Sequence, residues 1–570
     1  MLQWAHGVVP GDARLNLWAM TWQWRTIMTS PANLWNGNAF YPFPGSITGS
    51  DHLFTEVLIG LPVYLITNNP FLTYHFVLFA GYAIGAWGMY FLCLSLFHRV
   101  TPAVAAAIFY TVALPRSVHA AAHIQIASMA WIPWSAFFLH TIFKRPGGWA
   151  TCCLIVTHVL QILTGWYVAV YHGLIMTILT LTLTIRYRRR EPVALAVLAA
   201  VIALVMIIPF ALPYIGRPSV PPDVWPHYSA HPTDYLTPAS YTVYSWNNHS
   251  LRMWSETTVW MGFIAPALVL ITLFFRGKPD RLGRRPEVPG YILSLIAGIA
   301  LSFGTHFPGL PDAWTPWNLL ARLPAVSGMR VPARFVMMVV FALSVLFGRA
   351  VWVIAHKLTW RRLGESIAVL AVILTMVENY PTVQVEPVRV RIPPVYDWLT
   401  TIPDSVAIAE APSFYGSDLW AFSADYMMYA ALHRHPIANG YSRYVPDGFP
   451  EISDAIKHLP HPAAIRRLKN AGIVFVILHP RMFFTDEMLG LFRTLSTSHN
   501  PMLVFNDVIT ASNTLYQSFH SPEGLMMELR FMQSPYLDFV DRFGEDLVFY
   551  LKDTQLVDAQ GAQPNDSESM

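Results

Sequence analysis

Residues 193–214 read VALAVLAAVIALVMIIPFALPY, and this stretch decides the fold. It contains no charged side chain, and as a helix rising 1.5 Å per residue it is long enough to cross a bilayer core of about 30 Å. Phe71 to Phe97 is a second run of this kind. Only 12% of the whole chain is charged, against about 25% in a soluble domain. Because a spanning segment must satisfy its own backbone hydrogen bonds, the pattern predicts a polytopic α-helical membrane bundle.

Polar interruptions separate ten such spans, predicted at 71–97, 101–117, 126–143, 149–164, 166–186, 192–214, 258–275, 289–305, 332–355 and 363–379. Lys and Arg mark the cytoplasmic side of a bundle. If the first span runs inward, every dense basic cluster of the membrane region falls on that side: Arg99, Lys144–Arg145, Arg186–Arg190, Arg276–Arg285 and Lys357–Arg362. This alternation sets the orientation. The net charge of +3 is too small to indicate a nucleic-acid partner.

The same orientation places five segments outside, at 1–70, 115–125, 215–257, 306–331 and after about 380. The apolar stretch Leu53 to Ile66 would reverse all later loops if it spanned, so we interpret it as an interfacial helix on the outer leaflet. Residue 1 would then lie outside with no hydrophobic segment before it. We therefore expect an N-terminal transmembrane helix to be missing from this sequence, which leaves about ten spans.

The chain changes character after residue 380, where charged residues become common. Short β-like runs alternate with helix-like stretches, which predicts a small extracytoplasmic α/β domain. The β-like runs are Val406–Ala409, Ile473–Leu478 and Met502–Phe505, and the helix-like stretches are Phe449–His458 and Ala463–Ala471. The predicted organisation is an outer first loop with the interfacial helix (1–70), the bundle (71–379), the α/β domain (380–557) and a polar, disordered tail (558–570).

The first outer segment places two acidic residues, Asp12 and Asp51, among many aromatic side chains and turn-forming Gly and Pro residues. Carboxylates at an interface can act as general bases or bind cations, and aromatic faces suit sugars and lipid headgroups. The alternative is structural, because Trp and Tyr are enriched at every membrane interface and Asp12 could cap a helix that begins near Ala13.

The second outer segment contains His119 and His123, which share one face if the segment is helical. They could bind a metal, but no acidic third ligand lies nearby in sequence. Hydrogen bonding to a substrate or to the first loop is the alternative. The third outer segment is rich in possible ligands but lacks metal-site spacing: Asp223, His227, His231, Asp234, Tyr235, His249 and Glu256.

Arg330 and Arg334 lie close together at an outer helix entrance, against the usual distribution of basic residues. Such residues are either anchors for lipid headgroups or ligands of a phosphate.

Several short motifs follow one another in a recognisable order: Gly11-Asp12 with Asn16 and Trp18, Tyr41 to Gly45 with Asp51-His52, His123-x-Gln125, Arg330 to Phe335, and Asn439 to Ser442. Over nearly its whole length the chain resembles the GT-C-fold membrane glycosyltransferases. It is most similar to a prokaryotic branch related to the protein mannosyltransferases and the lipid A aminoarabinose transferase. Each motif alone is short, and their order carries the resemblance.

The resemblance implies transfer of a sugar from a polyprenyl-phosphate donor to a glycan, lipid or protein acceptor at the outer face of the cell (inner) membrane. Asp12 would be the base, and Asp51 would orient the acceptor or bind a cation, so a divalent cation is a possible cofactor. The loop lacks the Asp-Glu pair of some relatives, and the base assignment therefore rests on Asp12 alone. The residues assigned to substrate binding are His52, His123, Gln125, Arg330 and Arg334.

The alternative function is a non-catalytic or transport protein for lipid-linked glycans or surface-polymer assembly. Transporters that move such cargo usually bury ionisable residues inside their spans. Here the span interiors are nearly free of Asp, Glu, Lys and Arg, with His75, His158 and His172 as exceptions. The charges gather instead in the outer loops, which favours chemistry at the membrane surface.

Overall fold

The structure is a computed structural model that describes residues 11–120, 122–238, 242–244, 255–275, 288–357, 361–380, 392–417, 419–483 and 521–553. The chain forms two compact units. We call Asp51–Val385 the helical unit. We call Met1–Ser50 together with Glu386–Ser498 and Leu503–Met570 the mixed unit, because it contains both helices and strands.

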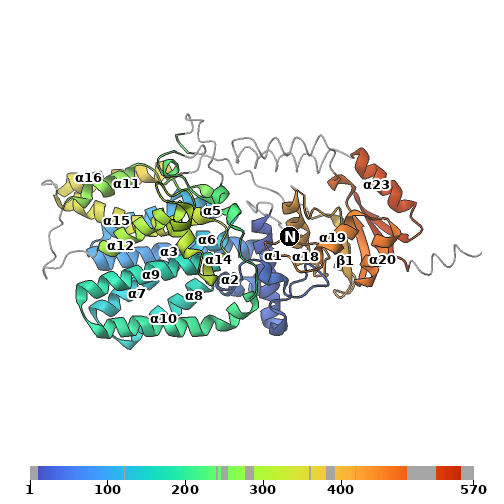
Figure 1. The fold of residues 1–570 in the computed structure, drawn as a ribbon, viewed down its shortest axis with the longest axis horizontal. Coiled ribbons are helices and arrows are strands. Elements are labelled where there is room, and N and C mark those ends of the chain that lie inside the picture. Colours follow the sequence, from blue (N-terminus) through green and yellow to red (C-terminus); the bar gives the residue numbers. More distant parts are fainter. Residues whose placement is uncertain are drawn as a thin grey trace, which may run out of the picture. The chain divides into compact units, whose positions relative to one another are not determined.

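The helical unit is built from long helices that lie side by side (Figure 1). Its α-helices are α2 (Phe54–Thr67), α3 (Pro70–Phe97), α4 (Val100–Val112), α5 (Leu114–Ala120), α6 (Ile124–Ser128), α7 (Ile132–Lys144), α8 (Gly148–Ile162), α9 (Trp166–Tyr187), α10 (Arg190–Ala211), α11 (Ile264–Leu273), α12 (Pro289–Ser302), α13 (Pro316–Leu320), α14 (Pro324–Ser327), α15 (Val336–Lys357) and α16 (Arg361–Asn379).

Each of the ten predicted spans contains a helix of this unit, and the predicted helical bundle is confirmed. Among the described residues, four helices are long and apolar enough to cross a membrane: Pro70–Phe97, Trp166–Tyr187, Arg190–Tyr214 and Pro332–Ala355. The pair α4 and α5, bent by 44°, makes a fifth if it is one span. The helices of the other five predicted spans are 13, 15, 10, 14 and 19 residues long.

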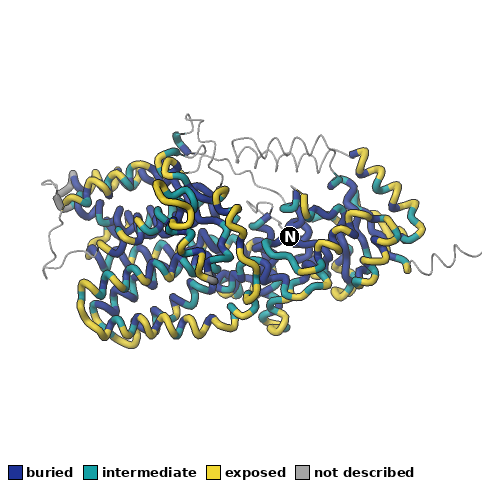
Figure 2. The backbone as a smooth tube through the Cα atoms, viewed as in Figure 1, coloured by how far each residue is buried: buried dark blue, intermediate teal, exposed yellow. Residues whose placement is uncertain are grey.

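Burial separates a central helix from peripheral ones. In Pro332–Ala355, 89% of the apolar window is buried, and its helix α15 packs against α4, α11, α12 and α16. In Arg190–Tyr214 the buried share is 22%, so most of this helix is exposed (Figure 2). A hydrophobic helix that stays exposed needs an apolar solvent, which fits a membrane. The apolar stretch 193–214, from which the bundle was predicted, therefore lies at the periphery of the bundle.

The described part of the mixed unit contains a four-stranded sheet in the order β1-β2-β4-β3 (Figure 1). β1 and β2 are parallel, and β4 pairs antiparallel with both β2 and β3. Its elements are α1 (Asp12–Thr29), α17 (Pro394–Leu399), β1 (Ala407–Ala411), α18 (Ser423–His433), α19 (Phe449–Lys457), α20 (Pro462–Asn470), β2 (Ile473–Leu478), α23 (Pro522–Met532), β3 (Leu537–Phe543) and β4 (Asp546–Leu551).

This sheet confirms the predicted α/β domain, with two predicted strands and two predicted helices found as β1, β2, α19 and α20. The hairpin of β3 and β4 was not predicted. β3 is an edge strand whose residues are mostly exposed, so its sequence lacks the alternation of apolar and polar residues that marks a half-buried strand. Met502–Phe505 and the tail 558–570 lie outside the described residues.

The first predicted outer loop is divided between the two units at Ser50. Helix α1 packs against α18, where Arg14 forms a buried ion pair with Asp425 and Arg25 donates a hydrogen bond to the carbonyl of Ala431. The side-chain amide of Asn38 donates to two backbone carbonyls near the end of α18, at 2.9 and 3.0 Å. The segment before Ser50 is therefore an integral part of the mixed unit.

Candidate functional site

A buried arginine holds the second predicted outer loop of the helical unit in place. The guanidinium of Arg116 is fully buried and donates to the carbonyls of Ala127, Tyr110 and Ser128 at 2.5, 2.9 and 2.7 Å. It also lies over the rings of Tyr82 and Tyr110, 4.3 and 4.4 Å from their centroids. Satisfying a buried cation with backbone carbonyls constrains the chain that carries them. Arg116 thus fixes α5 and α6, the helices that border the predicted His-x-Gln motif.

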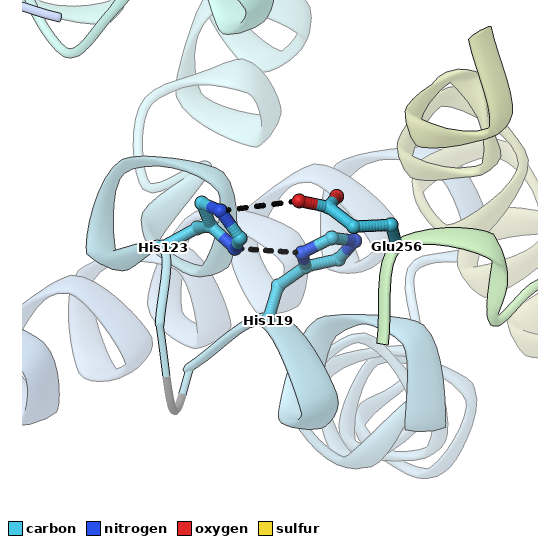
Figure 3. Close-up of side chains that lie close together, drawn as sticks. All are labelled: His119, His123 and Glu256. Atoms are coloured by element: carbon cyan, nitrogen blue, oxygen red, sulfur yellow. Dashed lines mark hydrogen bonds and ion pairs between the residues drawn. The ribbon is translucent and has the colours of Figure 1, made fainter. Parts of the chain in front are cut away.

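Four polar side chains from three distant segments meet in one buried cluster. His119 and His123 face each other with their Nδ1 atoms 3.3 Å apart, and the carboxylate of Glu256 points toward His123 (Figure 3). Arg334 donates to both carboxylate oxygens of Glu256, at 2.8 and 2.7 Å, and to Nε2 of His123 at 2.8 Å. All four residues are at most 5% exposed. Glu256 is thus the acidic partner that the sequence did not reveal near the two histidines.

Burial by itself would raise the pKa of the Glu256 carboxyl, but the neighbouring Arg334 guanidinium and the two histidines outweigh burial and hold this pKa well below its usual range. Glu256 is therefore ionised, and Arg334 balances its charge. The predicted phosphate ligand Arg334 already has a carboxylate partner within the protein.

Asp51 accepts hydrogen bonds on both carboxylate oxygens. Oδ2 accepts from Nε2 of Gln125 at 3.0 Å, and Oδ1 accepts from the backbone N–H of Trp166, also at 3.0 Å. The structure therefore brings two predicted site residues together, Asp51 from the first outer segment and Gln125 from the second. With both oxygens engaged, Asp51 is well oriented, and its lone pairs are less available for taking up a proton.

His52 is fully buried beside an aromatic pair, with its ring 5.0 Å from that of Trp166 and 6.1 Å from that of Tyr214. Its Nδ1 accepts a hydrogen bond from the backbone N–H of Phe54. Burial lowers the pKa of His52 to about 4, although the nearby Asp51 carboxylate acts in the opposite direction. His52 is therefore neutral at physiological pH and acts as a polar aromatic contact.

This lowered pKa makes the folded state sensitive to acid. The unfolded chain takes up a proton on His52 below about pH 6.5, whereas the folded chain does so only near pH 4, so stability falls as the pH drops through this window. Protonation of His52 changes the free energy of unfolding by about 3 kcal/mol over the full window. We expect thermal unfolding in detergent between pH 7 and pH 4.5 to show a weaker pH dependence for His52→Asn than for the wild type. Replacement of the exposed His98 by Asn is the control, and equal slopes for all three chains would contradict the assignment.

Arg330 differs from Arg334 in its surroundings. Its backbone N–H donates to the hydroxyl of Tyr167 at 2.5 Å, and its guanidinium lies over the ring of Tyr228, 4.8 Å from the centroid. Its Nε atom is buried without a hydrogen-bond partner, and among the described residues no carboxylate pairs with it. A half-buried cation without a counter-charge is suited to bind an anion.

Asp12 lies in the mixed unit, at the first position of α1. The residue before it, Gly11, has φ of 87°, a conformation that favours glycine, and caps the helix without a side-chain hydrogen bond. Asp12 is therefore the first helical residue and not the cap itself. Its Oδ1 accepts a hydrogen bond from the hydroxyl of Tyr441 at 3.0 Å. The Gly-Asp motif of the first segment thus meets the Asn-Gly-Tyr-Ser motif of the α/β domain.

Each of the residues Asn439, Gly440 and Tyr441 in that motif has a structural role. Asn439 exchanges two hydrogen bonds of 2.8 Å with the backbone of Glu410 in β1, which aligns the loop with the strand. A Cβ atom on Gly440 would overlap the ring of Phe40. Tyr441 is held by an edge contact with Trp420, with ring centroids 5.3 Å apart, and reaches Asp12. The motif therefore serves to support the first segment.

The structure thus groups the predicted site residues in three places: Asp51, His52 and Gln125 around one carboxylate, His123 with Arg334 and Glu256, and Asp12 with Tyr441 in the other unit. Arg330 stands apart from these hydrogen bonds. Sequence reasoning missed the roles of Arg116, Glu256 and Tyr441. Their only sequence signals were an arginine and an acidic residue in outer segments, and a tyrosine inside a short motif.

Taken together, these features define a polytopic membrane protein whose helical bundle and small α/β domain each contain buried polar clusters. Its fold is the GT-C fold of membrane glycosyltransferases, as the motif order predicted. The chain is similar to the solved structure of the arabinofuranosyltransferase AftD from Mycobacteria, with a TM-score of 0.55 and 14% identity, and this similarity supports the fold. The alignment covers 96% of this chain and 38% of AftD, so the chain spans well under half of that protein.

Two further solved structures are less similar to this chain. The archaeal oligosaccharyltransferase AglB from Archaeoglobus fulgidus, solved with an inhibitory peptide and a dolichol-phosphate, has a TM-score of 0.46 and 13% identity, covering 87% of this chain and 68% of AglB. ArnT from Cupriavidus metallidurans has a TM-score of 0.46 and 13% identity, covering 99% of this chain and 96% of ArnT. No protein-family model and no curated protein sequence matches the chain.

Proposed function

We propose that this protein is a membrane glycosyltransferase that moves a sugar from a polyprenyl-phosphate donor to an acceptor on the outer face of the cell membrane. The GT-C fold supports a glycosyltransferase of this general kind. The observation that carries the proposal for this chain is the half-buried guanidinium of Arg330, which has no carboxylate partner among the described residues.

Arg330 is the side chain that we assign to the donor phosphate. When the sugar leaves its lipid carrier, negative charge develops on the phosphate, and a preorganised cation near that oxygen lowers the barrier. Arg330 can provide this charge because nothing in its described surroundings neutralises it. Arg334 is less suited to this task, because its guanidinium already donates hydrogen bonds to both carboxylate oxygens of Glu256. The assignment of the sequence motif is thereby sharpened to one of its two arginines.

The proposed reaction is an inverting displacement. The oxygen of an acceptor hydroxyl forms a bond to the anomeric carbon while the bond from that carbon to the phosphate oxygen breaks, and the lipid phosphate leaves with the electron pair. The hydroxyl proton passes to a carboxylate, for which we propose Asp12. We assign Asp51, with both of its oxygens engaged, to orientation and not to proton transfer. His52, His123 and Gln125 are proposed to line the substrate path of the helical unit.

One observation favours the alternative, a transporter of lipid-linked glycans. In the bundle, Nδ1 of His158 and Nε2 of His172 lie only 2.6 Å apart, and both rings are buried. A pair of ionisable side chains between helices is a common element of proton-driven transport. Replacing His172 by Phe would stop such transport, whereas it would leave the transfer chemistry proposed above in place.

The test supplies a panel of radiolabelled polyprenyl-phosphate sugars to membranes that contain the full chain and follows label entering an acceptor fraction. We expect transfer from at least one donor, absent from membranes that lack the chain and strongly reduced with Asp12→Asn. Transfer that survives His172→Phe separates the enzyme from the transporter. Movement of an intact lipid-linked sugar across vesicles, without transfer from any donor, would establish the transporter and overturn the proposed function.

A further inference from the structure

The His119, His123 and Glu256 cluster has the composition and spacing of a divalent-metal site. Two imidazoles and a carboxylate form a common ligand set for zinc. Ligand atoms about 2.1 Å from one ion in tetrahedral geometry lie about 3.4 Å apart. The Nδ1 atoms of the two histidines are 3.3 Å apart, close to that separation. With one ligand atom taken from each of the three residues, all three atoms lie within 4.8 Å of one another. All three ligand residues are buried and mutually within reach.

The hydrogen bonds of Arg334 nevertheless use the lone pairs that a metal would need. An arginine has donors and no acceptor, so Nε2 of His123 must accept the bond from Arg334 and carries no proton. Neutral His123 therefore carries its proton on Nδ1 and donates it to Nδ1 of His119, which uses the lone pair of that nitrogen as well. Both oxygens of Glu256 accept from Arg334. Each of these ligand atoms thus either accepts a hydrogen bond or carries a proton itself.

Charge leads to the same result. Glu256 and Arg334 balance each other, and both histidines accept or share protons as neutral rings in this arrangement. A divalent ion added beside Arg334 would leave an excess of two positive charges among side chains that are at most 5% exposed. Burying uncompensated charge is costly. With an uncharged side chain at position 334, the same ion would face one carboxylate and two neutral imidazoles, which is an ordinary zinc environment.

We infer that Arg334 is the resident cation of this cluster and closes a latent zinc-type site formed by His119, His123 and Glu256. In the wild-type chain, the guanidinium balances the charge of Glu256 and occupies both of its oxygens together with Nε2 of His123. Removing it opens the site. This inference concerns metal binding alone, so its success or failure is independent of the proposed sugar transfer.

The experiment measures Zn²⁺ bound to the detergent-purified full chain after equilibrium dialysis. Other histidines can bind zinc, so the readout is the difference that His119→Ala makes. We expect His119→Ala to leave the zinc content of the wild-type chain unchanged. In an Arg334→Met background we expect one additional equivalent of zinc, bound roughly 100-fold more tightly than in the Arg334→Met, His119→Ala double variant. Zinc should also raise the unfolding temperature of Arg334→Met but not that of the double variant.

Two results would overturn the inference. If the wild-type chain binds an equivalent of zinc that His119→Ala removes, then Arg334 does not close the site. If Arg334→Met is folded and gains no zinc that depends on His119, the cluster is not a latent metal site. Arg334→Gln repeats the second arm with a side chain that can still donate a hydrogen bond to Glu256. The comparison of the wild type with His119→Ala decides whether Arg334 closes the site, even if neither Arg334→Met nor Arg334→Gln folds.

Discussion

Replacing Asp12 with Asn should lower the rate of sugar transfer by about 10²- to 10⁴-fold, the range that a general base contributes. The amide keeps the shape of the side chain and its position at the start of α1, but it cannot accept the proton of an acceptor hydroxyl. The measurement is the initial rate of transfer from the donor that the radiolabelled panel identifies. The binding of this donor to the membranes should change little, because we assign Asp12 to proton transfer and not to donor binding.

Two further variants separate the chemistry of Asp12 from the stability of its unit. Asp447→Asn makes the same chemical change at an exposed site of the mixed unit and should leave the rate unchanged. Tyr441→Phe removes the hydroxyl that donates to Oδ1 of Asp12. Because that hydrogen bond stabilises the charged carboxylate, the acidic limb of the rate profile should move toward higher pH. Equal rates for Asp12→Asn and the wild type would remove Asp12 from the role of base.

Replacing Arg330 with Gln should lower kcat/KM for the lipid donor by about 10²-fold, with little change in the unfolding temperature. The first effect follows from losing a cation at the leaving phosphate. The second follows because Arg330 is half-buried and makes no ion pair among the described residues. Rates and thermal unfolding measured on one preparation test both parts.

Arg334→Gln is the matched substitution, four residues along the chain. For this variant we expect the larger effect on stability and the smaller effect on kcat/KM. It leaves the Glu256 carboxylate buried without its guanidinium partner, which costs about 3–5 kcal/mol of stability. A large loss of stability in Arg330→Gln with unchanged kinetics would assign that arginine to structure and refute its role at the phosphate.

The membrane architecture could be predicted because it depends on local properties. The length and apolar composition of a run such as 193–214 predict a membrane-spanning helix. Each of the ten predicted runs contains a helix in the structure. The strand Ile473–Leu478 was located by the same kind of reasoning. β3 escaped because an exposed edge strand has no apolar face to mark it. Which of the helices is central was also hidden, because a strongly apolar helix can face either lipid or protein.

The candidate site could be predicted only as a set of residue types in outer segments. Asp51 and Gln125 were both named from the sequence, but their hydrogen bond joins residues 74 positions apart. The partnership of Asp12 with Tyr441 spans 429 positions, and no local pattern reports it. The residue pattern alone gave no physical reason to separate Arg330 from Arg334, since a charged side chain looks the same whether or not a counter-charge lies nearby.

The sequence by itself therefore determined that this protein is a polytopic helical bundle with a small α/β domain and that its charged residues gather outside the spans. The length of an apolar run depends only on consecutive residues, so it can be recognised without knowledge of the folded structure. Only the tertiary structure decided that Glu256, far from both histidines in the chain, neutralises Arg334 and leaves Arg330 available for an anion. Electrostatic pairing acts over a few ångströms in space, and folding alone sets those distances.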